Sequence, residues 1–372
     1  SFSVLFQKPE KILRNRFDQR GQMIKQLYKR VNQYRKRSYL NDELYKTKRK
    51  YAFIGFGMHS LTSLYPILIH FGIALKYICT KESTADDHIR RIFPGTTLIH
   101  DLEFILNDPE VEGVFVSTYP ETHAQILTSL LMAKKKIFIE KPPCTNGTEL
   151  QKIIDTKREA VVKVGLQRRY WPGNKHLLNI RTKARSYIYK FYFGPYPQGN
   201  VFNELFIHAI DYCIFLFGDF SILNSSHQKY NDGITTQLHV THSNGIAGMI
   251  ELSTHYSWSD PVDSLSIHNV NELLEVNYPT SIVGHLKPGR FMHLPTERVL
   301  DKPVTSRQYF SANNLVIPAF NLNTLVLQGF YNEIRTFILL VENGQRLEND
   351  LTEMQSLYKI LDQLKAAAYP TA

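Results

Sequence analysis

Cysteines are scarce in this sequence, and long apolar runs are absent. The 372 residues include three cysteines, Cys79, Cys144 and Cys213. Their odd number and wide spacing argue against a disulfide framework or a zinc site and favour reduced thiols in a cytoplasmic protein. No stretch approaches the roughly eighteen consecutive apolar residues of a transmembrane helix. The basic start of the chain contains no continuous apolar region followed by small residues, so no signal peptide is predicted.

Internal repeats of solenoid length are also missing, and the only biased segment is a basic stretch at the start. A hydrophobic fraction of 43% and an aromatic fraction of 12% exclude a disordered chain, a collagen-like chain and a coiled-coil rod. The length exceeds that of one typical globular core, so two domains with an appendage are predicted.

The positive charge is concentrated at one end of the chain. The formal net charge is +10, yet residues 1–50 hold 15 Lys and Arg against 4 Asp and Glu, and residues 51–372 hold 29 against 30. Within the basic segment, apolar residues recur at helical spacing at Leu13, Phe17, Ile24, Leu27, Val31 and Tyr34. Residues 1–50 are therefore predicted to form a basic amphipathic helix and a linker. One interpretation is contact with nucleic acid or an anionic surface; the favoured one is packing of the apolar stripe on the body or on a neighbouring subunit.

Residues 51–165 alternate short apolar segments with helical stretches. The expected strands are 51–54, 74–79, 113–117 and 137–139, with helices between them. Such alternation predicts a parallel, doubly wound sheet. In residues 166–372 the pattern changes to alternating strands, with a Ser243-Asn244-Gly245 turn that is typical of a hairpin. The predicted fold class is α/β: a dinucleotide-binding domain, then an α/β domain with an open, mainly antiparallel sheet.

The turn after the first strand has the sequence Gly55-Phe56-Gly57-Met58-His59-Ser60. In a dinucleotide-binding turn Gly55 would make the tight bend and Gly57 would let backbone N–H groups approach a pyrophosphate at the helix N-terminus. Ser60 replaces the third glycine and is small enough for close packing. Where a NAD site usually has an acidic residue, the second strand ends in Thr80 and Lys81. A hydroxyl beside a cation favours NADP over NAD, unless Lys81 is an ordinary solvated lysine.

Several further sequence motifs follow along the chain. They are Ile137 to Pro143, which contains Glu140-Lys141-Pro142, Val116 to Ala124, Gly165 to Tyr170, Asn203 to Asp211, Phe215 to Gly218 and Gln328 to Ile334. Over about residues 51–366 they resemble the glucose-fructose oxidoreductase and inositol dehydrogenase family, Gfo/Idh/MocA. The resemblance implies an N-terminal Rossmann domain, a nicotinamide cofactor, and sugars, sugar nucleotides, cyclitols or related polyols as substrates. It also implies a homo-oligomer, a dimer or tetramer, that uses one face of the open sheet.

The cofactor is expected to contact a set of residues on the Rossmann domain. The set is Gly55, Gly57, Met58, His59, Thr80, Lys81, Ser117, Thr118, Tyr119, His123, Glu140 and Lys141. His59 and His123 are interpreted as packing or backbone contacts, not as acid or base groups.

Hydride transfer from a secondary alcohol needs a positioned carbinol carbon and a base for the hydroxyl proton. His208 is the predicted general acid/base, and Lys141, at the carboxyl end of a parallel strand, is the predicted positioning group and possible proton relay. Glu204 stands one helical turn before His208 and replaces the Asp that the family usually has; it is predicted to bind a substrate hydroxyl. Asp211 is expected to cap the helix in preference to orienting His208.

Arg168, Arg169 and Tyr170 are assigned to the substrate, because an arginine fork suits a phosphate or carboxylate. One of the two arginines could equally be a solvated surface residue. No metal site is predicted, since no histidine or cysteine pair also recruits a third ligand. The sequence therefore predicts an NAD(P)-dependent oxidoreductase that acts on a sugar-type hydroxyl or ketone. The alternative is a non-catalytic, dinucleotide-sensing regulatory protein on the same fold. Nucleic acid is not favoured as a partner.

Overall fold

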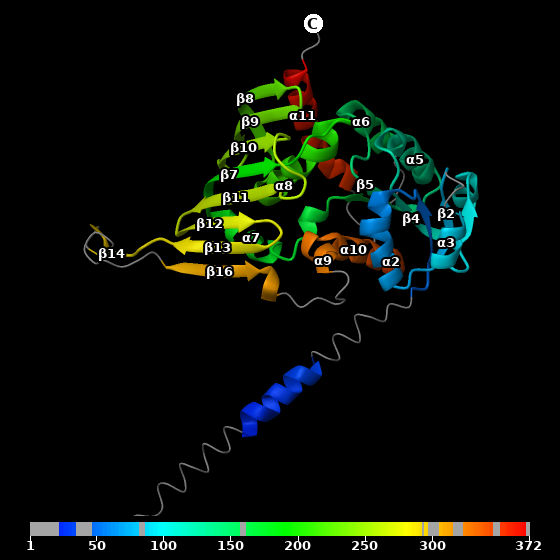
Figure 1. Ribbon diagram of the computed structural model, residues 1–372, viewed down its shortest axis with the longest axis horizontal. Helices are drawn as coiled ribbons and strands as arrows, with labels where there is room; N and C mark the ends of the chain where they lie inside the picture. The colour runs from blue at the N-terminus through cyan, green and yellow to red at the C-terminus, as the bar shows by residue number, and fades with distance from the viewer. Residues whose placement is uncertain are drawn as a thin grey trace, which may run out of the picture.

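The computed structural model describes residues 22–34, 47–81, 86–156, 161–291, 294–296, 305–314, 323–344 and 350–369. Its body contains two large sheets that lie side by side with helices around them (Figure 1).

The first sheet is parallel and has the strand order β3-β2-β1-β4-β5-β6. Its strands are β1 Lys50–Ile54, β2 Leu75–Cys79, β3 Thr97–Ile99, β4 Val111–Val116, β5 Lys136–Glu140 and β6 Val162–Gly165. The helical elements between them are η1 Ser60–Leu64, α2 Tyr65–His70, α3 Asp86–Ile92, α4 Glu103–Leu106, α5 Pro120–Met132 and α6 Gly147–Thr156. The central strands are almost continuously apolar because helices cover both faces of such a sheet. This order is that of a Rossmann domain and confirms the predicted doubly wound sheet.

The second sheet has the order β16-β13-β12-β11-β7-β10-β9-β8. Its strands are β7 Ala184–Tyr192, β8 Phe220–Tyr230, β9 Gly233–His242, β10 Ala247–Ser253, β11 Val262–Asn269, β12 Glu272–Asn277, β13 Ser281–Leu286 and β16 Ser306–Ser311. All neighbours are antiparallel except β7 and β10. The predicted hairpin joins β9 to β10. A small ribbon pairs β14 Arg290–Phe291 with β15 Leu294–Pro295.

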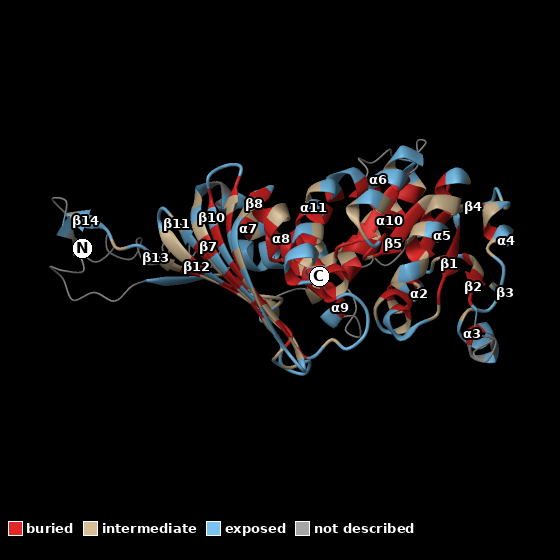
Figure 2. Ribbon diagram, turned by 90° about the horizontal axis from the view of Figure 1, so that it is seen from above, coloured by how far each residue is buried: buried red, intermediate tan, exposed pale blue. Residues whose placement is uncertain are grey.

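One face of the second sheet carries helices, and the other is open in the described part of the chain (Figure 2). The covering elements are η2 Gln167–Tyr170, α7 Asn174–Ile180, η3 Arg181–Lys183, η4 Phe202–Phe206 and α8 Ile207–Phe217. Along β7 the buried side chains Tyr187, Tyr189 and Phe191 alternate with more exposed ones such as Ile188, as expected for a sheet with one covered face.

The last helices of the chain return to the first domain. They are α9 Asn323–Gln328, α10 Phe330–Asn343 and α11 Asp350–Ala368, and η6 Ala312–Asn314 precedes them. Phe337 of α10 packs edge-on against Phe115 of β4, with ring centroids 5.0 Å apart. In α11, Asp350 accepts hydrogen bonds from the Lys163 ammonium (2.9 Å) and the Val164 N–H (3.0 Å) of β6. The domain boundary predicted at residue 165 coincides with the end of β6. The core of the first domain nevertheless includes residues of helices far beyond that boundary.

The N-terminal segment differs from one part of the favoured interpretation, packing on the body of the same chain. Residues 22–34 form a helix, drawn in blue apart from the body in Figure 1. Its apolar side chains are exposed, with Leu27 at 63% and Val31 at 48%. The apolar stripe therefore does not pack on the body of its own chain. Leu13 and Phe17 lie outside the described residues.

The three cysteines are buried and none is bonded to another. In the described part of the chain, no helix combines the length and the apolar character needed to cross a bilayer.

Candidate active site

The turn after β1 brings the Gly55 backbone against the neighbouring strand β4. Gly55 has φ of +114°, and a Cβ placed on it would lie 2.0 Å from the Ser117 carbonyl oxygen. Only glycine fits this combination of positive φ and close approach. The Ser60 side chain is fully buried, and its hydroxyl lies 3.1 Å from the Ser117 hydroxyl. Ser60 thus provides the close helix-to-strand packing expected at the third position of the turn.

Gly57 has open space beside it: a Cβ at this position would meet no described atom within 4 Å. The helix begins at residue 58, and its first internal hydrogen bond runs from the Leu61 N–H to the Gly57 carbonyl (3.0 Å). The N–H groups of residues 58–60 therefore precede the helical ladder. A helix N-terminus next to unfilled space fits an anionic pyrophosphate, so this turn can hold a dinucleotide.

The end of β2 lies beside this turn, because Cys79 is paired with Ile54. Thr80 is buried; its N–H donates to the Ile99 carbonyl (3.1 Å), and its own carbonyl accepts from His100 Nδ1 (2.6 Å). Lys81 is exposed. Both residues thus stand at the carboxyl edge of the sheet, where ligands of open α/β sheets bind.

The segment after β4 is tied to the segment after β5 by a buried histidine. His123 Nδ1 donates to the Pro142 carbonyl (2.7 Å), and Nε2 accepts from the Thr118 N–H (3.4 Å). Burial lowers the pKa of His123, which agrees with a neutral ring in this tautomer. His123 therefore links the two segments through backbone contacts, while Tyr119 remains exposed beside it.

The carboxyl end of β5 supplies Glu140 and Lys141. Glu140 is buried, and its Oε1 lies 3.2 Å from His59 Nε2. Burial raises the pKa of Glu140, but the contact with His59 and the positive charge of Lys141 outweigh that effect and hold the pKa below its usual value. Gly165 of the adjacent strand β6 leaves room for this carboxylate, since a Cβ there would lie 2.9 Å from Oε2. Glu140 is therefore a buried anion next to the Lys141 ammonium.

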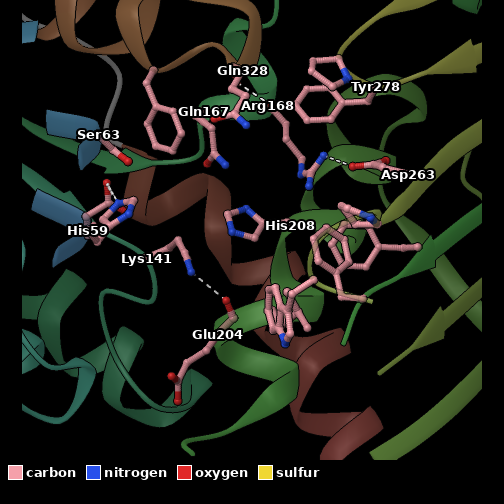
Figure 3. Close-up of a pocket in the computed structure, with 18 of the residues that line it drawn as sticks. His59, Ser63, Lys141, Gln167, Arg168, Glu204, His208, Asp263, Tyr278 and Gln328 are labelled. Carbon is pink, nitrogen blue, oxygen red and sulfur yellow. Dashed lines mark hydrogen bonds and ion pairs between the residues drawn. The ribbon is translucent and has the colours of Figure 1, made fainter. Parts of the chain in front are cut away.

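A cavity of about 420 Å³ opens between the two domains (Figure 3). Its lining residues are His59, Ser63, Glu140, Lys141, Gln167, Arg168, Phe191, Phe193, Tyr196, Glu204, Leu205, His208, Trp258, Pro261, Asp263, Tyr278, Pro279, Gln328 and Phe330. Six of these nineteen residues are Phe, Tyr or Trp, and charged side chains line the same cavity, which is the usual make-up of a small-molecule site.

Lys141 and His208 face this cavity from opposite domains. The Lys141 ammonium donates to the backbone carbonyl of Glu204 (2.7 Å), which anchors it beside the His208 helix. Burial lowers the pKa of Lys141. Burial and the positive charges of Lys141 and Arg168 hold the pKa of His208 well below its usual value. The His208 ring makes no hydrogen bond to any described residue, so a neutral imidazole is available to a ligand.

Glu204 has a different use from the predicted one. Its carboxylate accepts from the Tyr196 hydroxyl (2.8 Å) and the Asn200 N–H (2.6 Å), and it points away from His208 in Figure 3. This arrangement therefore does not favour Glu204 as a ligand of a substrate hydroxyl. The carboxylate instead holds the loop after β7, and the backbone of the same residue anchors Lys141.

The two arginines are separated by the fold. Arg168 lines the cavity, pairs with Asp263, and stacks 4.3 Å from the centre of the Tyr278 ring. Arg169 is bound by Asp211 (2.6 Å) and Glu353 (3.0 Å) and is not among the described cavity residues. Of the two arginines that were assigned to the substrate, only Arg168 therefore lines the cavity. Asp211 pairs with Arg169 instead of capping its helix.

Tyr170 also lies outside the cavity lining of the described chain. Its ring faces the Lys163 ammonium at 5.0 Å. Asp263 and the aromatic wall residue Trp258 were missed by sequence reasoning. They come from β11 and the loop before it, fifty or more residues after His208, and no local motif marks them. Within the described residues, no group of three potential metal ligands gathers here or elsewhere.

Fold and cavity together define a two-domain α/β protein with a glycine turn, suited to a dinucleotide, at the edge of a cavity between the two domains. Residues 49–167 match the family described as "Oxidoreductase family, NAD-binding Rossmann fold", GFO_IDH_MocA. Residues 49–167 thus match the family that the resemblance indicated.

Similar curated proteins match only parts of the chain. Inositol 2-dehydrogenase of Salmonella typhimurium is 32% identical over 84 residues, which is 22% of this chain and 25% of that protein. Inositol 2-dehydrogenase of Agrobacterium fabrum is 28% identical over 139 residues, 34% of this chain and 41% of that protein. The chain thus spans from about a quarter to less than half of the length of these two relatives.

Solved structures match most of the chain at low identity. A dehydrogenase from Chromobacterium violaceum has a TM-score of 0.72 at 17% identity and covers 86% of this chain and 95% of its own. Levoglucosan dehydrogenase in complex with NADH and L-sorbose has a TM-score of 0.68 at 18% identity, covering 86% and 96%. A 3-ketoreductase from Actinomadura kijaniata, in complex with TDP-benzene and NADP, has a TM-score of 0.65 at 16% identity, covering 86% and 97%. At these identities the likeness shows the shared fold.

Proposed function

We propose that this protein is an NAD(P)-dependent oxidoreductase that transfers a hydride between the cofactor and a hydroxyl or keto carbon of a sugar, sugar nucleotide or related polyol. The observation that carries the proposal is the meeting of Lys141 and His208 in one cavity at the edge of the Gly55–Gly57 turn. Relatives named inositol 2-dehydrogenase and levoglucosan dehydrogenase support the substrate class.

The cofactor would lie along the carboxyl edge of the first sheet. Its pyrophosphate would be held at Gly57, Met58 and His59, and its nicotinamide half would be directed by the segments after β4 and β5 toward Lys141. Thr80 and Lys81 would face the adenine ribose, and a hydroxyl with a cation there favours NADP. When bound, the nicotinamide supplies or accepts the hydride.

The chain's own residues manage the proton and the position of the substrate. In oxidation, the neutral His208 imidazole takes the hydroxyl proton, because its lowered pKa keeps it unprotonated at neutral pH. The Lys141 ammonium, held by the Glu204 carbonyl, donates to the same oxygen and fixes the carbinol carbon. Arg168 is kept charged by Asp263 and offers its guanidinium to polar groups of the substrate. In this proposal Glu204 is a positioning residue.

The exposed face of the second sheet supports self-association. Ile188, Leu223 and Met249 are 40%, 68% and 50% exposed on strands β7, β8 and β10. A homo-oligomer would cover such side chains. Three buried, unpaired thiols are consistent with the reducing conditions of a cytoplasm.

The first test is a titration with NADH and NADPH that follows tryptophan fluorescence. The chain has two tryptophans: Trp171 is 1% exposed, whereas Trp258 is 52% exposed and lines the cavity. We expect micromolar binding with a preference for NADPH. If the quenching arises at the cavity, a Trp258→Phe variant loses it. Nicotinamide fluorescence then shows that this variant still binds the nucleotide. If neither nucleotide binds, the proposed function is wrong. Binding without turnover across hexoses, cyclitols and sugar nucleotides would favour the regulatory alternative.

The pH behaviour of His208 provides an independent check. Because burial and nearby cations depress its pKa, its ring is expected to remain neutral near pH 6.5, where half of an ordinary histidine population is protonated. NMR titration of the ring C–H signal, assigned with a His208→Gln variant, measures this directly. Lys141→Ala removes a neighbouring positive charge and is expected to raise the pKa of His208. An inflection near pH 6.5 in the unmodified protein would contradict the proposed base.

A further inference from the structure

The N-terminal helix, residues 22–34, exposes a continuous apolar face. At about 100° per residue, its six apolar side chains fall within an arc of about 140°. They are Met23 at 65% exposure, Ile24 at 64%, Leu27 at 63%, Tyr28 at 68%, Val31 at 48% and Tyr34 at 75%. No described residue of the body covers them. This face is too apolar to be explained as a solvated surface.

The opposite side of the same helix is polar and basic. Lys25 and Lys29 lie there together with amide side chains, Arg30 lies at the edge of the apolar face, and the helix contains no acidic residue. The surrounding segment has the same sign of charge, since residues 1–50 hold 15 Lys and Arg against 4 Asp and Glu. The rest of the chain is nearly neutral by the same count. The basic charge therefore belongs to this appendage and not to the cavity.

We propose that this helix binds an anionic phospholipid surface. A helix about 20 Å long that lies in a membrane interface buries its apolar face at the acyl boundary while its lysines and arginines meet lipid phosphates and carboxylates. Nucleic acid would satisfy the cations and leave the apolar face in water. A protein groove would satisfy the apolar face and would need its own acidic rim. An anionic bilayer meets both faces at once, and charge attraction adds to apolar insertion.

The test is co-sedimentation of the full chain with vesicles. Phosphatidylcholine vesicles with about 30% phosphatidylserine should bind the protein, pure phosphatidylcholine vesicles should not, and about 0.5 M salt should weaken the binding. Lys25→Gln with Lys29→Gln should weaken it by about 25-fold, at roughly fivefold per lysine. Leu27→Ser with Val31→Ser keeps the charge and should abolish sedimentation, because the apolar face no longer inserts.

The matched control is Lys175→Gln with Lys359→Gln, which removes the same charge from exposed positions of the body and should bind as the unmodified chain does. Circular dichroism melting curves should be the same for all variants, because the helix does not pack on the body. The proposal fails if anionic vesicles do not sediment the protein, or if the serine variant binds like the unmodified chain. Binding to duplex DNA that needs the lysines but not Leu27 and Val31 would assign the helix to nucleic acid. A lower oligomeric state of the serine variant in light scattering, without vesicle binding, would assign it to self-association.

Discussion

Replacing Lys141 with alanine is expected to lower kcat/KM by about two to four orders of magnitude, the range typical for loss of a proton-transferring or positioning group. The reason is that the ammonium, held by the Glu204 carbonyl at 2.7 Å, is the donor placed to fix the substrate oxygen beside His208. Cofactor affinity should be largely retained, since the pyrophosphate turn lies at Gly55 to His59. Steady-state rates and NAD(P)H titration of the same preparation separate the two effects.

The same strand provides a matched control for this experiment. Lys136, at the opposite end of β5, also donates its ammonium to a backbone carbonyl, that of Val341 (3.1 Å). It lies at the amino edge of the sheet, away from the cavity, so Lys136→Ala should leave kcat/KM unchanged. Normal turnover by Lys141→Ala would rule out the proposed mechanism, and equal losses in both variants would show that the effect is structural.

The second large effect separates the two glycines of the cofactor turn. Gly55→Ala forces a Cβ to within 2.0 Å of the Ser117 carbonyl at a positive φ, so the free energy of unfolding should fall by about 3 kcal/mol or more. Gly57→Ala meets no described atom within 4 Å and should change the unfolding free energy by less than about 0.5 kcal/mol. Its added methyl group would occupy space proposed for the pyrophosphate, so NAD(P)H affinity should fall about tenfold or more.

Urea unfolding and cofactor titration of both variants check this pair. The informative outcome is the crossed pattern, in which Gly55→Ala loses stability and Gly57→Ala loses affinity alone. A Gly57→Ala protein that binds NAD(P)H as tightly as the unmodified chain would move the dinucleotide away from this turn. An unchanged unfolding midpoint for Gly55→Ala would mean that the β1–β4 contact is looser than the structure shows.

Much of the Rossmann domain could be predicted because its signals are local. Strand β1, the glycine turn and the following helix are contiguous, and the backbone requirements of that turn select residue types directly at Gly55 and Gly57. Lys141 was recognisable from the contiguous Glu140-Lys141-Pro142 motif, and a residue that follows a parallel strand lies at the carboxyl edge of the sheet. The apolar periodicity of residues 24–34 likewise indicated a helix without help from the rest of the chain.

The tertiary structure decided the partners of the charged side chains. Spacing placed Glu204 one turn from His208, yet its carboxylate turns to Tyr196 and Asn200 because the loop after β7 folds over it. Arg168 and Arg169 are adjacent in sequence, but the short η2 helix sends one into the cavity toward Asp263 and the other outward to Asp211. A carboxylate selects whichever donor the fold brings near, and that donor can lie anywhere in the sequence.

The sequence by itself therefore determined the strand–turn–helix around Gly55 and the position of Lys141 after a parallel strand, because each depends on residues that are neighbours along the chain. Only the tertiary structure showed that α10 completes the core of the first domain, that Asp263 and Trp258 reach the cavity, and that the basic helix leaves its apolar face uncovered. Those features depend on contacts between segments far apart in sequence. Such contacts leave no periodic signal in the residues that make them.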